Sequence, residues 1–233
     1  MTLARVIRSR RARTPRSTGV QLGEDQARAL ILRGAAGVFA KHGMRAASVQ
    51  NILAAAGVSR RTFYRFYTSK EDVAFALYRV GTEELLANCR RIVAQTADPI
   101  ARVQGFVEAH LHNARTVGRL VFVLGGEAQR QESALHARRL EVHAALADLL
   151  MASQPQTQGK TRTKRRAKSI DPLLYRGMIL GLEGVTRAVL QEGNEGRNVT
   201  DAAIQRARAV LMRMATAVLA GAGPNVAPMP MLS

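Results

Sequence analysis

The side chains best suited to bind a partner in this chain are grouped between residues 60 and 70. Arg60, Arg61 and Thr62 are followed closely by Tyr64, and Lys70 comes six residues later. An arginine guanidinium donates two parallel hydrogen bonds to O6 and N7 of guanine, and is therefore the side chain best suited to that base. Tyrosine and lysine suit phosphate oxygens, which position a protein without reading sequence. The segment predicts contact with a nucleic acid.

Histidines are the candidate metal ligands, and their spacing does not favour a metal site. His110 and His112 are two residues apart, so they do not share a face of a helix. His136 and His143 are two turns apart, without a nearby cysteine or paired acid. We therefore expect no metal.

Two acidic pairs are the candidate catalytic acids. Glu71-Asp72 follows Ser69, as expected of carboxylates in the first turn of a helix, and Glu83-Glu84 fits a solvated helix face. The sequence has no nucleophile elbow, phosphate-binding loop or metal-ligand spacing. We expect neither an enzyme nor a cofactor, although a helical enzyme or small-molecule carrier is an alternative for the later part of the chain.

The composition predicts a helical protein with a polyanionic partner. Of 233 residues 47% are hydrophobic, mostly alanine, leucine and valine, and tryptophan is absent. The formal charge of +18 indicates nucleic acid or an anionic membrane surface as partner. The single cysteine, Cys89, excludes an internal disulfide and suits a reducing compartment. Without a signal peptide or a long apolar run, we expect a cytoplasmic protein that does not enter a membrane.

The basic cluster lies within a predicted helix-turn-helix, residues 48–67, hereafter the reading head. Apolar residues recur every three or four positions over residues 25–42, predicting a first helix that stops at Gly43. Ser48 caps a short helix through Ala56, and Ser59 caps a second one to about Phe66. The alanines at 54–56 would let these two helices cross closely. Val58, Phe63 and Phe66 would hold the second helix on the core while the arginines face outward.

The rest of the chain predicts further helices and no useful strand. The caps and apolar patterns give helices at about 69–94 and from 98 onwards, an apolar stretch at 120–124 that ends at Gly125-Gly126, and helices at 127–151, 171–191 and 200–220. The expected fold is all-α: an N-terminal three-helix helix-turn-helix DNA-binding domain followed by a larger helical domain for ligand binding and dimerisation.

Residues 25–80 resemble the N-terminal domain of the TetR family of repressors. The likeness rests on FAKHG at 39–43, SVQNILAAAGVS at 48–59, TFYRFY at 62–67 and SKED at 69–72. The resemblance implies that Arg60, Arg61 and Thr62 approach bases, and that Ser48, Tyr64, Arg65 and Lys70 contact phosphates. Position 61 is commonly glycine in this family, so the arginine here indicates an operator of its own.

The resemblance also implies a ligand pocket and a dimer interface after residue 70. Candidates for the pocket combine apolar bulk with a few polar groups, although each also fits an ordinary core: Phe106, His110, Asn113, Phe122, Glu127, Tyr175 and Met178. Candidates for the interface are small or apolar residues of the last two helices, which also fit an intramolecular core: Gly177, Gly181, Gly184, Ile204, Leu211, Met214 and Val218. A two-fold DNA site favours the dimer.

The expected organisation has three segments outside packed domains. They are a flexible basic arm at residues 1–23, a mobile basic loop at 153–169 and a disordered tail at 222–233. Between them lie the DNA-binding domain at 24–70 and the ligand-binding and dimerisation domain at 71–221. The arm and the basic run at 160–168 are candidates for supplementary DNA contacts.

The function expected from these features is that of a homodimeric repressor released from a palindromic operator by an unidentified small molecule. Its partners would be double-stranded DNA, a second copy of the chain and the effector. A nonspecific or architectural nucleic-acid-binding protein, or an activator with the same fold, is the alternative.

Overall fold

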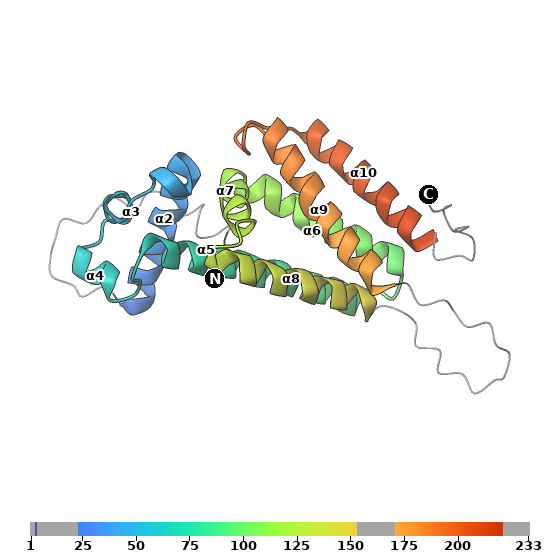
Figure 1. Ribbon diagram of the computed structural model, residues 1–233, viewed down its shortest axis with the longest axis horizontal. Coiled ribbons are helices and arrows are strands. Elements are labelled where there is room, and N and C mark those ends of the chain that lie inside the picture. Colours follow the sequence, from blue (N-terminus) through green and yellow to red (C-terminus); the bar gives the residue numbers. More distant parts are fainter. Residues whose placement is uncertain (1–2, 4–22, 153–170, 221–233) are drawn as a thin grey trace, which may run out of the picture.

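The computed structural model describes residues 3, 23–152 and 171–220, and each element in these ranges is a helix (Figure 1). The helices are α2 (Glu24–Ala46), α3 (Val49–Ala56), α4 (Arg60–Tyr64), α5 (Lys70–Gln95), α6 (Pro99–Val117), α7 (Arg119–Ala128), α8 (Ala134–Met151), α9 (Pro172–Glu192) and α10 (Asp201–Ala220). Apart from Leu3 and Gly23, the predicted arm at 1–23 lies outside the described residues, as do the predicted loop at 153–169 and tail at 222–233.

The helix ends of the reading head follow the predicted caps. The Ser48 and Ser59 side chains accept hydrogen bonds from the backbone N–H groups of Asn51 and Thr62. Between the two helices Gly57 has φ 65°, a left-handed conformation that costs glycine little, and its N–H donates to Leu53 O at 2.9 Å. The regular part of α2 is interrupted at Gly43, where the sequence predicts its end.

The close helix crossing in this domain is between α2 and α3 rather than between α3 and α4. A Cβ atom added to Gly34 would lie 2.7 Å from the backbone N of Ala56 and 2.9 Å from its Cα. Ala54 and Ala55 are exposed, so the prediction that the three alanines allow α3 and α4 to cross is wrong for these two. The absent side chain of Gly34 and the buried methyl of Ala56 together bring α3 onto α2.

The predicted helix boundary at Gly125-Gly126 is also wrong. Helix α7 runs through both glycines to Ala128, and the break falls between Gln129 and Ser133, where the Ser133 side chain caps α8. Glycine lowers helix propensity by about 1 kcal/mol, which packing can outweigh. Leu120 and Leu124 before the two glycines and Ala128 after them are buried in the core, and their burial favours the continuous helix.

Two hydrophobic clusters form the core, and α5 contributes to both. The first cluster joins α2, α3 and α4 to Val73, Ala74 and Leu77 of α5. The second joins Leu86 and Cys89 of α5 to residues of α6, α8, α9 and α10. Helix α7 lies between the reading head and the body (Figure 1), and its buried leucines belong to the first cluster. The packing boundary therefore runs along α5 and does not coincide with residue 70.

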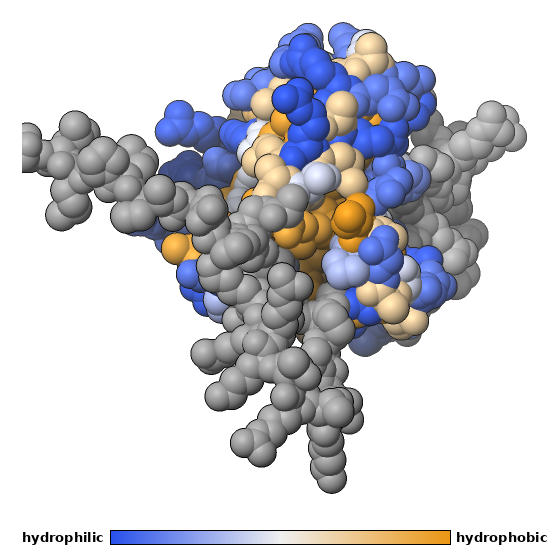
Figure 2. All heavy atoms as spheres, turned by 90° about the vertical axis from the view of Figure 1, so that its right-hand side faces the viewer, coloured by the Kyte–Doolittle hydropathy of each residue, from blue (hydrophilic) through white to orange (hydrophobic). Residues whose placement is uncertain are grey.

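Helices α9 and α10 pack side by side on the far side of the body from the reading head (Figure 1). Several of their large apolar side chains are exposed: Leu173, Leu174, Leu180, Val210 and Met214. Figure 2 faces the end of the molecule where α9 begins and α10 ends, and shows apolar surface between hydrophilic borders there. An uncovered group of large apolar side chains favours association with a partner surface.

Candidate functional site

Helix α4 presents basic side chains on the surface because its apolar side is firmly anchored. Phe63 is completely buried. The centre of its ring lies 6.0 Å from that of Tyr67 and 5.3 Å from that of Tyr64, with which it forms an edge-to-face pair. On the opposite side Arg60 and Arg61 are exposed, and Tyr64 is 48% exposed. The short helix therefore has the geometry of a rigid ridge that carries two guanidinium groups toward solvent.

The two arginines differ in how they are held. Arg60 Nη2 donates to Oε1 of Gln50 on α3 at 3.2 Å, which orients its guanidinium across the two helices. The side chain of Arg61 makes no hydrogen bond or ion pair with the described part of the chain. Gln50 was not among the predicted site residues, because its role depends on how α3 and α4 cross.

Ser48 and Thr62 are engaged in helix caps. Ser48 and Asn51 form a capping box, in which Ser48 N–H donates to Asn51 Oδ1 at 3.0 Å and Asn51 N–H donates to Ser48 Oγ at 3.1 Å. The Thr62 hydroxyl lies 2.8 Å from that of Ser59 and is partly buried. Backbone N–H groups in the first turn of a helix remain available to a phosphate. The predicted base contact of Thr62 and phosphate contact of Ser48 stay predictions.

Arg65 follows α4 and is held by weak, exposed contacts. Its Nη2 lies 3.2 Å from Oε1 of Glu24, and its guanidinium stacks at 4.7 Å from the ring of Phe66. An ion pair between such exposed side chains contributes little, so a phosphate can replace the carboxylate. Its predicted phosphate contact stays a prediction compatible with this geometry.

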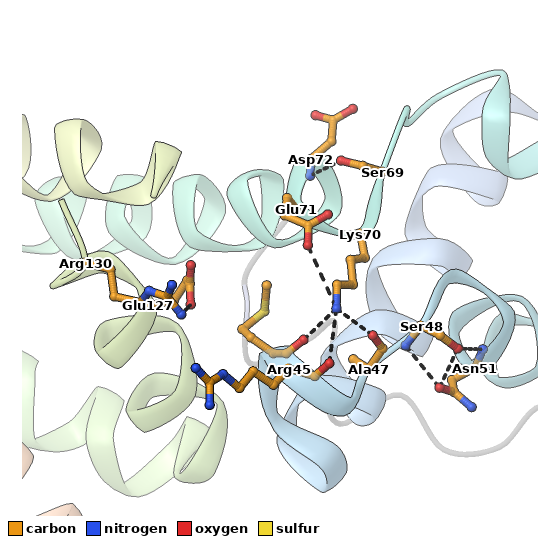
Figure 3. A network of polar contacts seen from close by, with 11 residues as sticks. Arg45, Ala47, Ser48, Asn51, Ser69, Lys70, Glu71, Asp72, Glu127 and Arg130 are labelled. Carbon is orange, nitrogen blue, oxygen red and sulfur yellow. Dashed lines mark hydrogen bonds and ion pairs between the residues drawn. The ribbon is translucent and has the colours of Figure 1, made fainter. Parts of the chain in front are cut away.

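Lys70, which the sequence assigned to a DNA phosphate, has partners within the protein (Figure 3). Its Nζ donates to Met44 O at 2.9 Å, Ala47 O at 2.8 Å and Arg45 O at 3.4 Å. These carbonyls end α2 and lead into α3, where a cation is favoured by the helix dipole. An ammonium has three donors, and all three are directed to carbonyls. Lys70 thereby connects the start of α5 to the segment that leads into the reading head.

We predict that Lys70→Met lowers the free energy of unfolding by about 1–3 kcal/mol, because carbonyls would lose a charged donor. Chemical denaturation measures this loss. Lys41→Met, at an exposed lysine of α2, is the control and should stay within about 0.5 kcal/mol of the parent. An unchanged stability combined with a weaker salt dependence of DNA binding would instead support the phosphate contact.

A cavity of about 140 Å³ lies in the body between α5, α6, α7, α8 and α9. Among the predicted pocket residues His110, Asn113 and Phe122 line it. Phe106 and Met178 line a second cavity of about 20 Å³. Tyr175 and Glu127 line neither cavity. Tyr175 is buried in the second cluster, and Oε2 of Glu127 lies 3.9 Å from Nη1 of Arg130. Core residues and cavity-lining residues have the same apolar sequence pattern, which explains why only some of the predicted residues line the larger cavity.

A charged cluster at the cavity involves residues absent from the predicted set. Glu183 accepts hydrogen bonds from Arg139 Nε at 2.9 Å and Nη2 at 2.6 Å, and His143 Nε2 lies 3.3 Å from it. Burial alone would raise the pKa of Glu183, but the bonds from His143 and Arg139 outweigh it and lower the pKa to about 2. Burial lowers the pKa of His110 to about 4, so this imidazole is neutral at pH 7.

The predicted interface residues divide between buried and open positions. Ile204 and Leu211 are buried in the second cluster, which favours the intramolecular core that the sequence left as the alternative for them. A Cβ on Gly181 would lie 2.8 Å from Met214 Cε, so this glycine serves the contact between α9 and α10. Gly177 and Gly184 have open space around them, and Met214 is exposed while Val218 is partly buried.

The described residues contain no group of three or more His, Cys, Asp or Glu side chains arranged to hold a metal ion. Among the helices that the structure describes, none combines the length and apolar character needed to cross a bilayer.

The sequence matches a family model and several known regulators. Residues 31–77 match the model of the tetR family of bacterial regulatory proteins. The chain is 35% identical over 103 residues to the HTH-type transcriptional repressor KstR2 of Mycobacterium tuberculosis, covering 44% of this chain and 52% of that protein. It is 31% identical over 91 residues to the transcriptional activator FasR of Mycolicibacterium smegmatis, covering 39% and 42%. The matched segment thus spans about half the length of these relatives.

The fold extends the likeness to the body of the protein. FadR from Bacillus subtilis, solved in complex with stearoyl-CoA, superimposes with a TM-score of 0.63 at 17% identity, covering 80% of this chain and 97% of that one. Its helical architecture is therefore the architecture found here. The capped helix pair and the arginines on α4 lie within the matched residues 31–77, so this segment is what the chain shares with the tetR family of bacterial regulatory proteins.

Proposed function

We propose that this protein is a homodimeric repressor that binds a palindromic operator and is released by a small-molecule effector. The observation that carries the proposal is α4, where buried Phe63 fixes a helix that presents Arg60 and Arg61 to solvent. A helix of this kind enters the major groove, and its N-terminal residues meet base edges. The likeness to the repressor KstR2, at 35% identity over 103 residues, supports the same assignment.

The exposed face of α9 and α10 supports the homodimer. Leu173, Gly177, Leu180 and Gly184 recur at intervals of four, three and four residues, so they lie on one side of α9. Val210 and Met214 are exposed on α10, which packs beside it. Pairing two copies across this face would form a four-helix bundle and set the separation of the two reading heads, as a two-fold operator requires.

The route from the cavity to the reading head runs through α5 and α7. Leu77 of α5 and Leu124 of α7 line the cavity and also belong to the first cluster with α2. Lys70, at the start of α5, holds the carbonyls that precede α3. A ligand that shifts α5 or α7 would therefore displace the reading head. The shift in DNA affinity is limited by the difference in ligand affinity between the two arrangements.

We predict that Arg61→Ala relaxes the base preference of the protein at one position of each half-site, at a cost of about 1–3 kcal/mol. The arginine at this position is free to reach a guanine, and alanine has no donor to replace it. Selection of bound oligonucleotides from a random pool, for the parent and the variant, measures the change.

Arg90→Ala is the matched control, because it removes the same charge from an exposed position on α5. It should leave the selected sequence unchanged. Selection of no palindrome by the parent would contradict the proposal and favour a nonspecific nucleic-acid-binding protein. An enriched palindrome whose bases are read equally well without Arg61 would contradict the role of this residue.

Activation is the alternative to repression, because the chain is also similar to the activator FasR. A reporter gene placed behind the selected operator separates the two. Repression predicts lower expression when the regulator is present, whereas activation predicts higher expression from the same site.

A further inference from the structure

The cavity in the body is predominantly apolar, and its size limits what it can hold. Leucine, valine and phenylalanine account for nine of its nineteen lining residues, among them Leu85, Val121, Phe122, Val142 and Leu146. A cavity of about 150 Å³ lined in this way accommodates a benzene-sized group. The volume of about 140 Å³ here fits a short alkyl chain or a single ring.

The charges at the wall do not cancel. Glu183 is balanced by Arg139, with which it shares paired hydrogen bonds, and its second neighbour is His143. His110, on the same wall, is neutral because burial lowers its pKa to about 4. Arg187 adds a further positive charge that no carboxylate of the described residues neutralises within ion-pair distance. Arg187 is therefore a positive charge at the cavity wall that has no ion-pair partner among the described residues.

The guanidinium of Arg187 is held in place without using its donors. It stacks at 4.7 Å from the centre of the Phe122 ring, and its nitrogens lie close to Gly126, where a Cβ would be 3.3 Å from Nη1. Stacking on a ring orients an arginine while leaving its edge free for a planar acid. Among the described residues, none accepts a hydrogen bond from this side chain that would occupy that edge.

The neighbouring residue supplies a second, independent sign of a missing partner. Thr186 is only 6% exposed, lines the cavity, and its Oγ1 makes no hydrogen bond with any residue that the structure describes. A buried hydroxyl without a partner costs free energy, so such groups are rare in folded proteins. The consecutive residues Thr186 and Arg187 thus offer a hydroxyl and a guanidinium to the same space.

We infer that the effector site binds a small amphiphile with an apolar body and one carboxylate, and that Arg187 and Thr186 bind the carboxylate. The regulatory role of this ligand rests on the proposed function, whereas the existence of the binding site does not depend on it. The carboxylate neutralises Arg187 in the apolar wall, while the alkyl or ring portion fills the space between α6, α7 and α8. Leu3 also lines the cavity, with its N–H donating to Glu84 Oε2 at 2.9 Å, so a longer ligand has to displace it.

The test compares octanoate with octanol and octanoyl-CoA, using calorimetric titration of the full chain. Octanol has the same chain without a charge, and the acyl end of octanoyl-CoA is an uncharged thioester. We expect octanoate to bind about tenfold or more tightly than either, as a charged hydrogen-bonded pair allows. Equal binding of octanoate and octanol, stronger binding of octanoyl-CoA, or binding of none of the three overturns the inference.

Variants of the two residues complete the test. Arg187→Met should abolish the preference for octanoate over octanol, and Thr186→Val should weaken octanoate binding while sparing octanol. Arg213→Met, at an exposed arginine of α10, is the charge-matched control and should keep the preference. A preference that persists in Arg187→Met overturns the inference, and circular dichroism verifies that each variant is folded.

Release of DNA is measured separately, so that failure of the inference and failure of the proposed function can be told apart. Arg187-dependent binding of octanoate without any change in operator affinity would support the site and contradict its effector role. Release of the operator by a compound whose binding ignores Arg187 would support the proposed function and contradict this site.

Discussion

Replacing Gly34 by alanine is expected to lower the free energy of unfolding by about 1–3 kcal/mol and to abolish operator binding. The added Cβ would lie 2.7–2.9 Å from the backbone and Cβ of Ala56, closer than atoms can approach. Backbone of a neighbouring helix cannot rotate away as a flexible side chain can, so α3 must move off α2. The gain in helix propensity, about 1 kcal/mol, is smaller than this cost.

Gly37→Ala is the matched control, because it makes the same change three residues later in the same helix. Nothing lies within 4 Å of a Cβ at Gly37, which is exposed, so the variant should be stabilised by about 0.5–1 kcal/mol. Thermal and denaturant unfolding of both proteins give the comparison. Two variants stabilised alike would mean that α2 and α3 do not cross closely at Gly34.

Leu180→Asp is expected to convert a dimer into monomers and to weaken operator binding by about 10²–10⁴-fold, since two linked reading heads bind far better than one. Leu180 is 52% exposed in the single chain, on the open side of α9. The substitution should therefore leave each chain folded and act on association alone. Sedimentation and operator titration measure the two effects.

Leu140→Asp controls for the general effect of a charge on an exposed leucine. Leu140 is 51% exposed on α8, outside the face formed by α9 and α10. Its variant should remain dimeric and bind the operator like the parent. A Leu180→Asp protein that still sediments as a dimer would exclude this face as the interface.

Local features of the sequence were enough to predict the reading head. Ser48, Ser59 and Ser69 each cap a helix by accepting a hydrogen bond from a backbone N–H three residues later. Both partners of each bond therefore lie within one helical turn of sequence. Gly57 likewise ends α3 by its own conformation. Such contacts depend little on the rest of the fold, and their residue types are diagnostic.

The cavity depends on contacts between distant residues, and the sequence did not indicate its key side chains. Glu183 and Arg187 are four apart on one helix, the usual spacing of a solvated ion pair. In the structure Glu183 bonds instead to Arg139 on α8, 44 residues earlier, which leaves Arg187 against Phe122. The contacts of Lys70 could not be predicted for the same reason, because the carbonyls it binds lie more than 20 residues away.

The sharing of one hydrophobic cluster between the reading head and α7 has a consequence for protein engineering. A chimeric regulator made by joining residues 1–70 to a foreign sensor would separate α2 from Leu120 and Leu124, which pack in the same cluster. The transplanted DNA-binding domain would then lack part of its hydrophobic core, and α7, left behind in the sensor domain, would expose Leu120 and Leu124. A replacement sensor domain would therefore have to retain the side chains of α7 that pack against α2. The unit that can be exchanged is defined by this packing surface and not by a boundary in the sequence.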